Sequence, residues 1–72
     1  MFMMNEILFM EMRLIRQFCK KHKLFSKDAN TLFKKFGIWE YIEECYDTLH
    51  MNGDDYIIND IEEIIVGRGG VL

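Results

Sequence analysis

The longest predicted helix spans residues 3–22, which are MMNEILFMEMRLIRQFCKKH. Ten of its apolar side chains fall within an arc of roughly 200° on a helical wheel, which is wide for a surface helix. We therefore expect this helix to be the centre of the fold, contacted from two sides. One acidic residue, Glu11, falls inside the same arc. Lys20, Lys21 and Lys23 favour the negative end of the helix dipole and predict the C-terminus there.

Three shorter helices are predicted in the rest of the chain, at residues 27–36, 38–50 and 60–66. Ser26 is expected to cap the first of these helices, and Gly37 is expected to end it. The second has the clearest pattern, with apolar residues on one face and acidic residues on the other. The sequence therefore predicts an all-α fold, a small compact bundle of about four helices with a long central first helix.

The last predicted helix is preceded by a turn and a short extended segment. Residues 51–53, Met-Asn-Gly, are a turn signal. Residues 56–58 contain two isoleucines and a tyrosine, which favour a brief extended conformation. Asn59 and Glu62 have the spacing of a capping box, so the helix is expected to begin after Asn59.

Length and composition restrict the class of protein. The chain has 72 residues, of which 50% are hydrophobic and 29% are charged, and it contains no proline. These values predict one globular domain and exclude intrinsic disorder. We expect a single helical domain at residues 1–66 and a flexible C-terminal tail at residues 67–72. No apolar run reaches the ~18 residues that cross a bilayer, and no basic segment marks an export signal, so a cytoplasmic protein without membrane contact is expected.

The charges are divided unequally along the chain. Residues 1–36 carry eight basic and three acidic groups, whereas residues 37–72 carry one basic and nine acidic groups. The two halves can pair with each other inside the molecule, or present one sign of charge to a partner.

Carboxylates crowd one side of the helix predicted at residues 38–50: Glu40, Glu43, Glu44 and Asp47. Like charges spaced by three or four residues destabilise an isolated helix by ~0.2–0.5 kcal/mol per pair. A face that meets only water usually has lysines among its acidic residues, and this face has none. Two interpretations stay open: a solvated face partly neutralised by Lys34 and Lys35, or a docking surface for a basic partner or a second copy of the chain.

Aromatic and basic residues lie in line on the other side of the first predicted helix: Phe2, Phe9, Arg13, Arg16 and Lys20. Such a strip can bind nucleic acid, because cations contact phosphates and aromatic rings stack on bases. A covered strip or a protein interface is favoured, since the net charge is -3 and a helix at residues 38–50 would repel phosphate. Nucleic-acid binding stays an alternative, and its residues would be Arg13, Arg16, Lys20, Lys21 and Lys23.

Residues that could support catalysis or hold a cofactor are sparse. Cys19, His22, Cys45 and His50 could be considered as zinc ligands, but Cys45 and His50 are five positions apart, which places them on different sides of a helix. No glycine-rich phosphate loop is present. We expect no enzymatic activity, no cofactor and no metal, and we expect the two cysteines to be free thiols.

A long pattern of residues runs through the chain up to Val66: Glu6-Ile7-Leu8-Phe9, Leu32-Phe33, Gly37, Tyr41-Ile42, Tyr46-Asp47, Leu49-His50, Gly53, Asp54 or Asp55, Tyr56-Ile57 and Asp60-Ile61. With this pattern the chain resembles a family of short uncharacterised bacterial proteins, all helical and known as a domain of unknown function. Members of that family look to be encoded often beside a protein similar to an ADP-ribosyltransferase toxin. The resemblance implies an antitoxin-like or accessory partner rather than an enzyme.

The function expected from these observations is protein–protein interaction. The acidic residues would orient a basic surface, and exposed aromatic side chains, Phe9 and Trp39, would anchor it. The partner implied by the resemblance is a toxin-like protein, and a homodimer is also open. A small nucleic-acid-binding regulator and a purely structural homodimer subunit are the alternatives.

Overall fold

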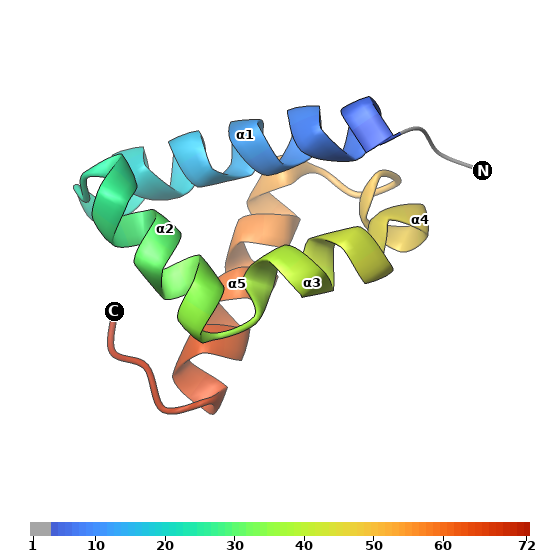
Figure 1. Ribbon diagram of the computed structural model, residues 1–72. Coiled ribbons are helices and arrows are strands. Elements are labelled where there is room, and N and C mark those ends of the chain that lie inside the picture. Colours follow the sequence, from blue (N-terminus) through green and yellow to red (C-terminus); the bar gives the residue numbers. More distant parts are fainter. Residues whose placement is uncertain (1–3) are drawn as a thin grey trace.

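The computed structural model describes residues 4–72, and that part of the chain contains five helices and no strand: α1 (Met4–His22), α2 (Ser26–Lys35), α3 (Ile38–Glu44), α4 (Tyr46–Leu49) and α5 (Asp54–Gly67) (Figure 1). The predicted small all-α bundle is confirmed, with five helices in place of four. α1 packs against α2, α3 and α5, as expected of a central helix. In Figure 1, α1, α2 and α3 form a three-sided arrangement, and α5 runs across it.

α1 keeps the predicted C-terminal end at His22. The next residue, Lys23, has a positive φ of 55°, and this left-handed conformation stops the helix. Basic residues occupy the last turn, where they interact favourably with the helix dipole. Met3, the first residue of the predicted helix, lies outside the described residues.

The start of α2 differs from the prediction. Ser26 is the first helical residue, and Phe25 occupies the N-cap position without a side-chain capping hydrogen bond. The predicted cap at Ser26 is therefore wrong, and burial of Ala29 and Phe33 holds the helix in place instead. The predicted end is confirmed, because Gly37 follows the helix with a φ of 68°.

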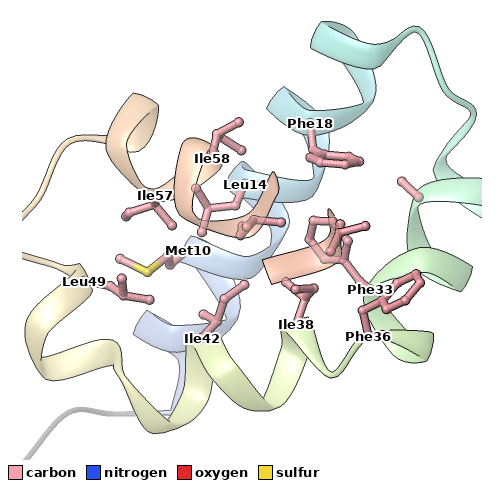
Figure 2. Close-up of a cluster of buried hydrophobic side chains, with 13 residues drawn as sticks. Met10, Leu14, Phe18, Phe33, Phe36, Ile38, Ile42, Leu49, Ile57 and Ile58 are labelled. Carbon is pink, nitrogen blue, oxygen red and sulfur yellow. The ribbon is translucent and has the colours of Figure 1, made fainter. Parts of the chain in front are cut away.

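The helix predicted at residues 38–50 is interrupted at Cys45. This residue has φ of −104° and ψ of 12°, and it separates α3 from α4. Neither glycine nor proline marks the position, so local sequence signals did not predict the break. The break changes the direction of the chain, and Leu49 of α4 joins Met10 of α1 in the core (Figure 2).

The predicted extended segment at residues 56–58 is wrong, because α5 already begins at Asp54. Gly53 occupies the N-cap position, so the predicted start after Asn59 is also wrong. β-branched side chains have only weak local preferences, and burial of isoleucines along one helix face overrides them here. Asp54 and Asp55 in the first turn add favourable charges at the positive end of the dipole.

The core is a continuous cluster of apolar side chains from all five helices (Figure 2). Its members are Met10, Leu14, Phe18, Ala29, Phe33, Phe36, Ile38, Ile42, Leu49, Ile57, Ile58, Ile61 and Ile65. Phe18 and Phe33 meet edge to face with ring centroids 5.1 Å apart, and Trp39 meets Phe33 in the same manner at 4.9 Å. At the edge of the core, the Tyr41 hydroxyl donates a 2.6 Å hydrogen bond to Asp60, which joins α3 to α5.

The residues that follow α5 fold back onto the bundle. The Arg68 guanidinium donates to the Phe36 carbonyl, and the Gly70 amide donates to the Ile65 carbonyl at 2.8 Å. A side chain at Gly70 would collide with Ile65, so this close approach requires glycine. The predicted domain boundary at Val66 thus falls inside α5, and contacts continue past it. The flexibility of residues 67–72 stays a prediction.

Replacing Gly37 by alanine should destabilise the fold by about 1–2 kcal/mol, because an L-residue pays this cost in the left-handed region. The added Cβ would also lie 3.0 Å from an Arg68 nitrogen. Gly67→Ala is the matched control, since Gly67 does not have a positive φ and nothing lies within 4 Å of an added Cβ. Urea unfolding of both variants measures the difference. Equal stability of the two variants would contradict the role of the Gly37 turn.

Candidate functional site

One flank of α1 is neutralised by the start of α5. The Arg13 Nε and Nη2 atoms donate to the two Asp54 carboxylate oxygens at 2.8 and 3.0 Å, and Gln17 Nε2 donates to the same carboxylate at 2.7 Å. The hydrogen bond from Arg13 holds the pKa of Asp54 below its ordinary value, against the opposing effect of burial. A bidentate arginine–carboxylate pair of this kind fixes the two helices in register.

A second ion pair joins the other end of this flank. The Lys21 ammonium lies 2.9 Å from a Glu62 oxygen, and His22 Nε2 lies 2.6 Å from the same oxygen. Burial opposes ionisation of Glu62, but the hydrogen bonds from Lys21 and His22 outweigh it, and the pKa of this carboxyl is lowered. Acidic groups of the C-terminal half thus neutralise basic groups of the N-terminal half within the chain.

These ion pairs divide the five basic residues proposed for nucleic-acid binding. Arg13 and Lys21 are paired with α5. Arg16, Lys20 and Lys23 are exposed, and among residues 4–72 none of the three forms an ion pair. The structure therefore does not present the five cations as one free surface.

The acidic residues of α3 and α4 lie on the surface. Glu40, Glu43, Glu44 and Asp47 are all exposed, and none is ion-paired with a lysine, arginine or histidine of the described residues. We call these four residues the acidic face. The helix is interrupted at Cys45, so Glu43 belongs to α3 and Asp47 belongs to α4. The prediction that both residues lie on one continuous helix is therefore wrong.

One end of the acidic face has cations near it. Glu40 and Glu44 line a shallow hollow together with basic side chains, namely Lys34, Lys35 and Arg68. This arrangement agrees with partial neutralisation at that end of the face. Glu43 and Asp47 do not line this hollow, so the part of the face around them has the less compensated charge.

A groove between α1 and α3 lies beside Glu43. It has a volume of about 360 Å³ and is lined by Leu8, Glu11, Met12, Ile15, Trp39 and Glu43. Four of these side chains are apolar or aromatic, and the two carboxyl groups come from facing helices. An apolar groove with a few converging polar groups is typical of a binding surface.

Glu11 has an unusual environment in this groove. Partial burial raises its pKa to about 7, and the nearby charges of Glu43 and Glu40, with a hydrogen bond to Glu43, add to the shift. Each of these effects disfavours the charged form of the Glu11 carboxyl, and the largest of them is burial in the groove. Near pH 7 the Glu11 carboxyl therefore changes charge, and a cation placed over the groove would favour loss of its proton.

The two predicted aromatic anchors have different environments. Phe9 is 64% exposed on α1, as an anchor requires. Trp39 is partly buried, its indole nitrogen donates to Asn30 at 3.2 Å, and its remaining exposed surface lines the groove. Phe2, which the sequence places in line with Phe9, lies outside the described residues.

Other candidate residues do not form a site together. Within residues 4–72 no group of three or more His, Cys, Asp or Glu side chains is arranged to hold a metal ion. Cys19 and Cys45 are free thiols, each partly buried against the core. In the same part of the chain, no helix combines the length and apolar character needed to cross a membrane.

Sequence reasoning did not identify the groove or the role of Glu11. The only signal for Glu11 in the sequence was its place as an acidic residue inside an apolar arc. That signal does not identify the residue that Glu11 contacts. The partner, Glu43, lies 32 positions away on another helix, and only the packing of α1 against α3 brings the two together.

Asp54→Asn should lower the free energy of unfolding by about 1 kcal/mol, because it removes the charged partner of Arg13 while keeping the shape of the side chain. Asp55→Asn is the matched control: it removes the same charge from the same helical turn, and Asp55 is exposed without an ion pair among the described residues. The control should lose only a few tenths of a kcal/mol, from the dipole. Thermal melts at neutral pH separate the two, and equal losses would show that the α1–α5 bridge adds nothing.

Stability should fall as the pH rises from about 4.5 to about 7, because the folded Glu11 keeps its proton in this window while the unfolded side chain loses it. Glu11→Gln should remove this slope and stabilise the protein at pH 8 by about 1 kcal/mol, after allowance for solvent in the open groove. Urea titrations at several pH values measure the slope. Glu63→Gln, an exposed site on α5, is the control and should leave the slope unchanged.

Comparison with known families identifies the relatives of the chain. A family model described as "Protein of unknown function (DUF3791)" matches residues 9–68, and the chain belongs to this family. The resemblance to a domain of unknown function is therefore confirmed. No curated protein and no solved structure matches the chain significantly.

Proposed function

We propose that this member of the DUF3791 family is a protein-interaction module without enzymatic activity, and that its docking surface is the acidic face together with the groove beside Glu43. One observation carries the proposal: Glu43 and Asp47 are exposed and have no ion pair among the described residues, and Glu43 lines an apolar groove. Elsewhere in the chain, Asp54 and Glu62 have cationic partners.

The physical argument concerns charge and hydration. Clustered carboxylates repel one another, and a cationic surface that meets them removes this repulsion and accelerates encounter. Apolar side chains in the groove supply the area whose burial stabilises the complex, which charge alone does not do. The partner is therefore expected to have a basic surface around one or two apolar anchors.

Phe9 and Trp39 have separate roles in this proposal. Phe9 is exposed and would insert into the partner. Trp39 keeps its hydrogen bond to Asn30 and would contribute only the part of its ring that lines the groove.

The resemblance to bacterial proteins encoded beside ADP-ribosyltransferase-like toxins supports a toxin-like partner in a bacterial cytoplasm, with an antitoxin-like or accessory role for this chain. Nucleic-acid binding is less well supported, since two of its five residues are already paired with α5.

The double variant Glu43→Lys/Asp47→Lys should weaken capture of the partner from the native host by about tenfold or more in low salt, since attraction becomes repulsion. The control is Asp55→Lys/Glu63→Lys, which changes net charge equally at exposed positions of α5. Quantitative mass spectrometry of the captured proteins gives the ratio, and circular dichroism checks that both variants stay helical. Equal capture by the two variants would remove the acidic face from the binding surface.

A further inference from the structure

The outer side of α1 carries apolar side chains that the fold does not cover. Leu8 is 49% exposed, Met12 is 48% exposed and Phe9, beside them, is 64% exposed. Leu8 and Met12 are one helical turn apart and form the outer wall of the groove, with Ile15 one turn further along. Exposed apolar side chains grouped in this way on a small protein indicate a contact surface.

Groups of opposite charge lie beside this surface. Beside Leu8 and Met12, the groove contains the carboxyl groups of Glu11 and Glu43. Toward the C-terminal end of α1 stand the exposed cations Arg16, Lys20 and Lys23, which form no ion pair among residues 4–72. The surface thus has carboxyl groups in the groove and cations toward the C-terminal end of α1, and Met12 and Ile15 lie between Glu11 and Arg16 along the helix.

A surface arranged in this way is complementary to itself when one copy is turned end over end. In an antiparallel pair of α1 helices, a two-fold axis can pass midway between Met12 and Ile15. Met12 of each copy then lies level with Ile15 of the other copy. The same axis places Arg16 level with the partner's Glu11, because the midpoint between positions 11 and 16 is also the midpoint between positions 12 and 15. Every favourable contact then occurs twice, as in any isologous interface.

We propose that two copies of this chain associate through the outer side of α1, antiparallel, so that Met12 packs on the partner's Ile15 and Arg16 lies over the partner's Glu11 and Glu43. This inference rests on the proposed function, because it assigns one occupant, a second copy, to the same groove. Arg16 lies one helical turn after Met12, four positions along α1. Side chains spaced by four residues form ridges that pack well between crossing helices.

The interface is small, so the association is weak. Three exposed apolar side chains per copy supply less area than a standard interface, and a dissociation constant on the order of micromolar or weaker is expected. Arginine has the reach and the planar donor geometry to contact both carboxyl groups. Association should therefore weaken with salt.

Sedimentation equilibrium of the full chain, from about 5 to about 500 µM, tests the proposal by a charge exchange. Arg16→Glu alone and Glu43→Arg alone should each weaken self-association by about tenfold or more, since each places like charges together. The combined variant Arg16→Glu/Glu43→Arg should associate about threefold or more tightly than either single variant, because the exchange restores opposite charges at positions 16 and 43, while the unchanged Glu11 prevents full recovery. Glu63→Arg makes the same charge change as Glu43→Arg on the exposed side of α5 and should leave association unchanged.

A chain that is monomeric throughout this range, or single variants that associate as before, would overturn the inference. A combined variant that stays as weak as the single variants would also overturn it. If the chain is monomeric but Glu43→Lys/Asp47→Lys still loses partner capture, the second copy is the wrong occupant while the proposed docking surface stands. If the charge exchange restores association but partner capture is unaffected, the second copy stands and docking of a different protein is wrong.

Discussion

The apolar stripe of α1 formed by Met10, Leu14 and Phe18 is the surface on which the rest of the fold depends. None of these side chains is more than 4% exposed, and Phe18 meets Phe33 of α2 edge to face. Helices of seven or ten residues are not stable alone in water, so α2 and α3 exist because they bury apolar side chains together with this stripe. Removal of the stripe would leave the other helices without a common core.

Polar side chains interact at the surface or at the edge of the core, because no polar or charged residue of the described chain is fully buried. They make the two flanks of α1 unlike. The flank toward α5 has Arg13 bound to Asp54, which holds the helices together. The flank toward α3 has Glu11 beside Glu43 in the groove, where burial and the neighbouring carboxylates raise the pKa of Glu11 to about 7. The first arrangement stabilises the fold, and the second leaves a site whose charge responds to pH and to approaching cations.

The acidic face could be predicted from residue spacing, but its surroundings could not. Sequence proximity suggested that Lys34 and Lys35 could neutralise it, and they do lie near Glu40 and Glu44. Sequence gave no indication that Arg68, from beyond α5, would line the same hollow. The sequence also could not show that Asp54 and Glu62 lie beside the basic residues predicted to form one surface. These two carboxylates pair with Arg13 and Lys21 and leave the other cations unpaired among the described residues.

The sequence by itself determined the all-α class, the C-terminal end of α1 and the turn at Gly37, because each depends on periodicity or on local residue preferences. Tertiary structure decided the break at Cys45 and the early start of α5 at Asp54. In both places local preference is weak, and the energy gained by burying Leu49 and the α5 isoleucines is larger. The groove likewise exists only because packing brings α1 and α3 together, since its two carboxyl groups are far apart in the chain.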